Sequence, residues 1–200
     1  YDFFNIVYAG NTYNKEIQKP FLTAIKELAR EGEIDKKDFR ITFVGFGNNV
    51  DKQFIYGNKM DQFFNFVPEV THAESVKIQM TADLLLLFAN FGPQISRWRT
   101  PGKFFEYLGT TKPILLLAQE KSAMADYLKW TKSGVLIDPA DLKGLKTTIA
   151  GFYNDWKNGE VCSMKGTPLL PRDNFKIENL TAKLENILTE VIEGNPVQKK

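Results

Sequence analysis

The residues best able to do chemistry lie in the stretch "RTPGKFFEYLGTTKPILLLA". Thr100 is placed to cap a helix, with Pro101 at the first helical position, where a missing N–H is tolerated. The free backbone N–H groups near Gly102 and Lys103 then form, with the helix dipole, a ready anion site. A lysine at a helix start is unfavourable by roughly 0.3–1 kcal/mol unless an anion lies there. This spacing predicts a bound phosphate.

Glu106 lies one turn into the same helix. A helical side chain leans over the preceding turn, so we expect its carboxylate to lie over Gly102, which has no side chain to block it. A carboxylate accepts hydrogen bonds from sugar hydroxyls, and phosphate and ribose together describe a nucleotide. The alternatives are that Glu106 is solvated or that it pairs with Lys103, three residues earlier. The pattern alone leaves these alternatives open.

The elements that must position these residues alternate along the chain. Apolar runs predict six strands, each followed by a segment of helical period, which indicates an α/β fold with a parallel sheet and helices on both faces. The predicted strands are "FFNIVYAG", "FRITFVGFG", "FNFVPEV", "DLLLLFA", "PILLLA" and "GVLIDP". A glycine at 109 predicts a break between the helix that carries Glu106 and the strand after it.

Helix signals support the same order of elements. Gly32 closes a helix whose apolar residues recur at helical spacing, and Asp141 caps another. Thr71 and Glu74 form a capping box, which begins a helix with Val76, Ile78 and Met80 available for burial. The last predicted helix, about 175–193, carries one apolar stripe: Leu180, Leu184, Ile187, Leu188, Val191 and Ile192.

Ligands of such sheets bind at the carboxyl ends of the strands. There the sequence has glycine and small polar residues, "AGN", "VGFGNN", "VPEVTH", "ANFGPQ" and "LAQEKS", which include Gly10, Asn11 and Gly45. Each segment taken alone also reads as an ordinary strand-to-helix turn. Their convergence at one edge of the sheet makes this edge the predicted site.

Composition sets limits on the function. The 200 residues suit one domain, are 43% hydrophobic and 25% charged, and carry a net charge of +2, which does not call for nucleic acid or an anionic membrane. The longest apolar run, Leu84 to Ala89, is too short to span a bilayer, and no signal peptide opens the chain. The single cysteine fits a reducing compartment. Because a strand begins almost at once, we expect the chain to be part of a longer protein.

The sequence offers no clear metal site and no catalytic triad. It holds one cysteine and one histidine, and no two aspartates have Asp-x-Asp spacing. His72 lies at the second position of the capping-box segment, which favours a structural role or a contact with a base edge over general-base work. We therefore predict neither a metal nor a cofactor.

At these residues the chain resembles the retaining GT-B glycosyltransferases, in particular the nucleotide-sugar-binding C-terminal half of the family-4-like group. The resemblance is strongest at "PGKFFEYLGTTKPILLL", a form of the family's P-x-K-x-x-E-Y-L segment, and continues through "VYAGN", "ITFVGFG", "VPEVTHAES", "TADLLLL" and "SGVLIDPADLKGL". It implies a Rossmann-like domain over residues 1–200, with a core of about 1–160. It also implies a separate N-terminal acceptor domain, through which any contact with a membrane surface would pass.

The resemblance implies a role for single residues. Glu106 takes the position of the ribose-binding glutamate, Gly102 and Lys103 that of the diphosphate-binding helix start, and Val70 to His72 that of the base-edge loop. The implied nucleotide-sugar site comprises Gly10, Asn11, Lys15, Gly45, Val70, Thr71, His72, Arg99, Thr100, Gly102, Lys103 and Glu106. The implied activity is metal-independent transfer of a sugar from a nucleoside diphosphate to an unidentified acceptor, in cytoplasmic polysaccharide biosynthesis, at the inner face of the membrane where membrane contact exists.

The chain departs from the family pattern at two positions. Asn11 stands where a basic residue often follows the first-strand glycine, and Trp98 stands where a second glutamate often positions the sugar, with Arg97 and Arg99 beside it. A non-catalytic nucleotide-sugar-binding module and half of a nucleoside-diphosphate-sugar epimerase therefore stay open as alternatives. A receiver domain is disfavoured, because the first strand ends in "VYAGN" without the acidic pair that such domains need.

Overall fold

The structure is a computed structural model that describes residues 2–11, 15–45, 50–89, 100–160 and 173–193. Its described strands form one sheet: β1 (Phe4–Ala9), β2 (Phe39–Val44), β3 (Phe64–Val67), β4 (Leu84–Ala89), β5 (Ile114–Ala118) and β6 (Gly134–Ile137). The strand order is β3-β2-β1-β4-β5-β6, and all neighbouring strands pair in parallel. The predicted parallel α/β sheet is confirmed.

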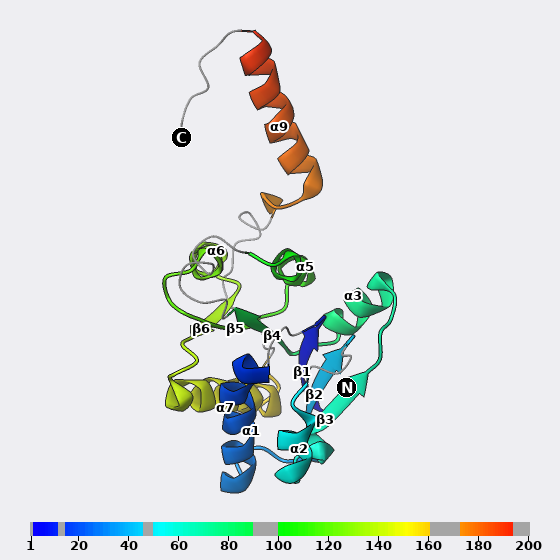
Figure 1. Cartoon of the computed structure of the whole chain (residues 1–200), viewed down its shortest axis with the longest axis vertical. Coiled ribbons are helices and arrows are strands. Elements are labelled where there is room, and N and C mark those ends of the chain that lie inside the picture. Colours follow the sequence, from blue (N-terminus) through cyan, green and yellow to red (C-terminus); the bar gives the residue numbers. More distant parts are fainter. Residues whose placement is uncertain (1, 12–14, 46–49, 90–99, 161–172, 194–200) are drawn as a thin grey trace.

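Helices cover both faces of this sheet (Figure 1). The described helices are α1 (Lys19–Glu31), α2 (Lys52–Gly57), α3 (His72–Met80), α5 (Gly102–Thr110), α6 (Ala123–Thr131), α7 (Leu142–Lys157) and α9 (Ile177–Ile192), with the short 3-10 helices η1 (Lys15–Gln18) and η2 (Asp61–Phe63). Helices α1, α2 and α7 contribute to the core on one face, and α5 and α6 to the core on the other. Helix α3 packs beside α5 and β1.

Alternating side chains of the strands divide the core into two parts. In β1, Phe4, Ile6 and Tyr8 pack toward α1 and α7, whereas Val7 and Ala9 pack toward α5. Every residue of β1, β4 and β5 is buried, as expected for strands covered on both faces. Each large apolar side chain so buried stabilises the fold by about 1.5–3 kcal/mol.

The strand order reverses next to β1. The chain leaves β1 toward β2 and β3, then crosses through α3 to β4, which pairs with the other side of β1 at Ile6 and Val7. Such a topological switch point is where open α/β sheets bind ligands. Two glycines with positive φ end the strands beside it, Gly10 (φ 100°) and Gly45 (φ 75°). Their N–H groups donate to the carbonyls of Val44 (2.9 Å) and Val67 (3.1 Å).

The ends of α5 differ from the prediction. Pro101, with φ −65° and ψ 145°, is extended and itself precedes the first helical residue, so Thr100 does not cap the helix and no side chain does. The helix also runs through Gly109 and ends at Thr110; the next residue, Thr111, adopts the left-handed conformation at φ 62°. A helix tolerates an interior glycine at a modest cost in stability, so this glycine did not mark a break.

Helix α9 lies away from the sheet at the end of the described chain (Figure 1). Just before it, the Phe175 ring packs against Phe105, Tyr127 and Trp130, with centroid distances of 5.2, 5.6 and 5.5 Å. No residue of α9 is buried. The predicted helix is confirmed, and its apolar residues are exposed: Ile177, Leu180, Leu184, Ile187, Leu188, Val191 and Ile192. No helix within the described residues is long and apolar enough to cross a membrane.

Candidate nucleotide site

A cavity of about 410 Å³ lies at the carboxyl ends of β1 and β2, between α3 and α5. It is lined by Ala9, Gly10, Asn11, Val44, Gly45, Glu69, Val70, His72, Ser75, Gln79, Lys103 and Glu106. The structure thus brings together these residues of the predicted site: Gly10, Asn11, Gly45, Val70, His72, Lys103 and Glu106.

The other predicted residues do not line this cavity. Lys15 is exposed in η1. Thr71 forms the predicted capping box of α3, in which its hydroxyl accepts from the Glu74 N–H at 3.3 Å. Thr100 and Gly102 lie at the start of α5, next to the lining residue Lys103. Arg99 lies outside the described residues, as does Trp98.

A larger cavity, of about 790 Å³, lies at the start of α6, and we do not place the site there. Its charged lining residues include Glu120 and Lys129, which pair with each other at 3.1 Å and are well exposed. Its buried polar group, Ser122, is occupied in capping α6. The smaller cavity, in contrast, collects a cation, a carboxylate and two glycine turns at the switch point.

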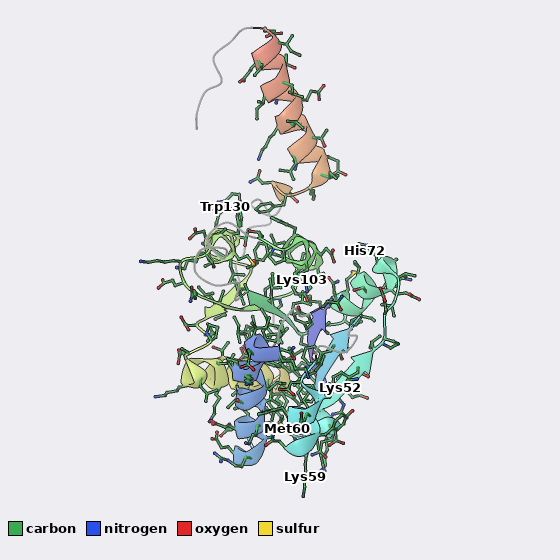
Figure 2. All side chains as sticks on the ribbon, viewed as in Figure 1. Lys52, Lys59, Met60, His72, Lys103 and Trp130 are labelled. Carbon is green, nitrogen blue, oxygen red and sulfur yellow. The ribbon has the colours of Figure 1, made fainter. Side chains whose placement is uncertain are left out.

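Lys103 reaches from α5 across the end of β1 (Figure 2). Its Nζ donates to the Tyr8 hydroxyl at 2.8 Å and to the Asn11 carbonyl at 3.4 Å, and it lies 4.4 Å from the centroid of the Tyr8 ring. A Cβ atom on Gly10 would lie only 2.9 Å from this Nζ. The positive φ favours glycine at position 10, and a side chain there would also displace the Lys103 ammonium.

Lys103 is held in a place that disfavours its own charge. Burial lowers the pKa of Lys103 to about 8, and the nearby Glu106 carboxylate opposes part of that shift. The positive end of the α5 dipole is unfavourable for a cation as well. A phosphate bound at the helix start would reverse both effects, because it offers the ammonium a counter-charge.

Glu106 contacts α3 rather than lying over Gly102. Its Oε1 lies 3.4 Å from His72 Nε2, and its Oε2 accepts from Gln79 Nε2 at 3.4 Å. Among the described residues it forms no ion pair with Lys103. The side chain is 38% exposed, so its carboxylate stays within reach of a ligand in the cavity.

Sequence reasoning missed Ser75 and Gln79, which share one face of α3 with the predicted site residue His72. His72, Ser75 and Gln79 follow one another at spacings of three and four residues, which places them on one face of the helix. All three line the cavity. The prediction that Met80 is available for burial is wrong, because Met80 is 57% exposed and its neighbour Gln79 is 1% exposed. The spacing of these polar residues was the signal that could have identified them.

Tyr107 fastens α5 to the end of β1. Its hydroxyl, which is fully buried, accepts a hydrogen bond from the Ala9 N–H at 2.8 Å. The burial raises the pKa of Tyr107 well above its ordinary value, so the phenol stays neutral. The same helix carries Lys103 and Glu106, and this bond therefore fixes them relative to the Gly10 turn.

Solved structures show what this arrangement is similar to. A glycosyltransferase from Rickettsia africae ESF-5 matches with a TM-score of 0.70 and 13% identity, over 96% of this chain and 48% of that one. The pneumococcal O-GlcNAc transferase GtfA, in complex with UDP and GlcNAc, matches at 0.64 and 12%, over 94% and 36%. The UDP-GlcNAc 2-epimerase from Methanocaldococcus jannaschii matches at 0.57 and 13%, over 93% and 46%. No protein-family model and no curated protein matches the sequence.

The chain has the fold of one GT-B domain. Its match to the Rickettsia enzyme covers nearly all of this chain but only about half of that one, as expected for one domain of two. At 12–13% identity these likenesses establish the fold of the GT-B domain. The case for the candidate site comes from the geometry of its own residues and not from these matches.

Proposed function

We propose that this GT-B domain binds a nucleoside-diphosphate sugar and, with a separate N-terminal domain, transfers the sugar to an acceptor. One observation carries the proposal: Lys103 and Glu106, from one helix, line the same cavity as the Gly10 and Gly45 turns at the topological switch point. Ligands bind at this place in open α/β sheets. A cation and a carboxylate at this spacing suit the diphosphate and the ribose of one nucleotide.

In this proposal the diphosphate lies at the start of α5, where the backbone is open. A Cβ atom on Gly102 would meet no atom of the described residues within 4 Å, and this space would let a phosphate approach the free N–H groups. Lys103 and the helix dipole would offset the charge that develops on the leaving diphosphate, which makes a metal unnecessary. Lys15 and Arg99 stay predicted to neutralise the diphosphate as well. Retention of the sugar's configuration also stays a prediction.

The base and the ribose would occupy the α3 side of the cavity. Val70 and His72 lie there and stay the predicted contacts of the base edge, and Glu106 would accept the ribose hydroxyls. The proposed location is the cytoplasm, on the strength of the single cysteine, with the membrane reached only through the second domain. We also propose that this second domain covers the apolar stripe of α9.

Two alternatives use the same cavity. Trp98, in place of an expected carboxylate, favours a module that binds a nucleotide sugar without turnover. The structural likeness to UDP-GlcNAc 2-epimerase favours half of an epimerase. Incubating the intact protein with UDP-GlcNAc and following the sugar by NMR tests the epimerase alternative, because an epimerase changes the sugar without an acceptor. A transferase without its acceptor and a binding module should both leave the sugar unchanged.

Calorimetric titration of the 200-residue chain with UDP, GDP and ADP tests the site itself. We expect one of the three to bind, and failure of all three at millimolar concentration would contradict the proposal. The chain alone should transfer no sugar, since the acceptor side of the site is proposed to come from the other domain.

The Glu106→Ala variant should weaken the nucleotide that binds by about ten- to a hundredfold, because hydrogen bonds to a charged group contribute roughly 1.5–3 kcal/mol. Glu33→Ala is the matched control, since Glu33 is exposed and lies outside the cavity lining. Equal affinities of the wild type and Glu106→Ala for the nucleotide would show that Glu106 is a solvated surface residue that does not contact the ligand.

A further inference from the structure

Gln79 is a buried polar residue that packing alone does not explain. It is 1% exposed in α3, and its Oε1 is buried with no hydrogen-bond partner among the described residues. An unpartnered amide oxygen in the interior is costly, and a leucine or methionine would fill the same space without that cost. The amide of Gln79 therefore has another task at the cavity that it lines.

The contacts of Gln79 indicate this task. Its Nε2 donates to Glu106 Oε2 at 3.4 Å and to Ser75 Oγ at 3.3 Å. His72 Nε2, at the start of the same helix, lies 3.4 Å from Glu106 Oε1. One face of α3 thus contacts both oxygens of the Glu106 carboxylate, which extends from α5.

These contacts leave some acceptor sites of the Glu106 carboxylate free. An ionised carboxylate has about four acceptor sites, two on each oxygen. Gln79 uses one site on Oε2, and the His72 ring lies near Oε1, so acceptor sites are left on both oxygens for a ligand. Two adjacent acceptors of this kind match two neighbouring hydroxyl groups, such as the 2′- and 3′-hydroxyls of ribose.

The contacts with Gln79 and His72 also direct the Glu106 carboxylate toward α3 and away from Lys103. The two residues lie three positions apart on α5, a spacing at which opposite charges commonly pair, yet they form no ion pair in the described structure. The Coulomb attraction between them is nonetheless felt at Lys103. Without Gln79 the carboxylate would be free to swing toward the helix start, where it would compete with a phosphate for the ammonium.

We propose that Gln79 is a positioning residue, which fixes the Glu106 carboxylate so that the site prefers ribonucleoside diphosphates over their 2′-deoxy forms. The inference rests on the proposed function, because it concerns the ribose of the nucleotide. Preorganisation is its physical basis: a carboxylate already held in the binding rotamer loses less conformational entropy when the ligand arrives. Ser75 supports the same arrangement by accepting from the Gln79 amide.

The test compares two ligands across matched variants. Calorimetry measures the affinity of the wild type for whichever of UDP, GDP and ADP binds, and for the 2′-deoxy form of the same nucleotide. We expect the wild type to prefer the ribonucleotide by about tenfold, as for one hydrogen bond to a charged group. Gln79→Met should weaken the ribonucleotide by about five- to tenfold and the deoxynucleotide by less than about twofold. Gln53→Met, on the exposed surface of α2, should change neither affinity.

Ser75→Ala is the second variant, because it leaves the buried amide in place. It should shift the preference in the same direction by about two- to threefold, a smaller effect because the amide keeps its contact with Glu106. If Gln79→Met does not fold, an unchanged preference in Ser75→Ala overturns the inference. Equal losses for both nucleotides in Gln79→Met also overturn it, because that pattern indicates a purely structural role.

The failure of the inference and the failure of the proposed function look different. If the wild type binds none of the three nucleotides, the proposed function fails and the inference fails with it. If the wild type binds a ribonucleotide and its deoxy form equally well, the nucleotide site stands and the role of Gln79 is wrong.

Discussion

At the scale of single residues, the candidate site holds two polar side chains in unfavourable surroundings. Lys103 keeps its ammonium in a half-buried place, above the Tyr8 ring and at the positive end of a helix. Gln79 keeps an amide oxygen buried, with no hydrogen-bond partner in the part of the chain that the structure describes. Such groups are commonly found where a ligand supplies the missing interaction. They identify this cavity more sharply than its size does.

The lowered pKa of Lys103, about 8, predicts a pH dependence of the proposed nucleotide binding. Below pH 8 the ammonium is charged and attracts the diphosphate; above it the free protein loses the proton, so affinity should fall as the pH rises from 8 to 10. Binding near pH 8 should take up a proton, because the diphosphate raises the pKa again. Calorimetry in buffers of different ionisation enthalpy measures both effects.

The Lys103→Met variant is the control for this dependence. It should bind the nucleotide more weakly at pH 7, and its affinity should change little between pH 8 and 10. The stability of the free protein gives a second check. The pKa of Lys103 is about 8 in the folded protein and 10.5 in the unfolded chain, so between these values the unfolded chain binds more protons. Lys103 should therefore make the wild type more stable to denaturant as the pH rises above 8, whereas nucleotide affinity should fall. An affinity that stays constant up to pH 10 in the wild type would show that Lys103 does not contact the ligand.

At the scale of elements, Gly10 at the end of β1 and Gly109 inside α5 have different tasks, which substitution separates. Gly10 has φ 100° and approaches Lys103, so Gly10→Ala should destabilise the fold by about 1–2 kcal/mol and weaken the nucleotide. Gly109 lies inside α5 with open space around it, so Gly109→Ala should stabilise the fold by about 0.5–1 kcal/mol. Urea denaturation of both variants measures the difference, and nucleotide titration of Gly109→Ala should match the wild type.

The same elements show what the sequence predicts and what it does not. Strand and helix order followed from hydrophobic period and caps, because a buried parallel strand and a capped helix each leave a local signal. The end of α5 did not, since Thr111 adopts a left-handed conformation that threonine seldom takes. The burial of Gln79 was also missed, because whether Gln79 or Met80 is buried depends on where α5 packs, which is a tertiary relation.

At the scale of the whole molecule, the fold brings the residues that line the candidate cavity to one edge of the sheet and leaves α9 outside it (Figure 1). The sequence predicted both the helix and its stripe, but no local signal tells which surface covers a stripe. The match to about half of the Rickettsia glycosyltransferase fits a second domain as the partner. In that arrangement the apolar stripe of α9 would stabilise the interface between the two domains rather than the fold of this domain.

Removing residues 177–200 should therefore leave the body of this chain intact. Since no residue of α9 is buried, we expect the thermal midpoint to shift by less than about 2 °C and the binding of an apolar fluorescent dye to fall. Replacing Leu184 and Leu188 by glutamine should lower dye binding in the same way without shifting the midpoint. Leu86→Ala, in β4, gives the contrast, because losing a fully buried leucine costs about 2–5 kcal/mol. A truncated chain that melts far below the wild type would mean that α9 packs on its own domain, and the proposed interface with a second domain would have to be given up.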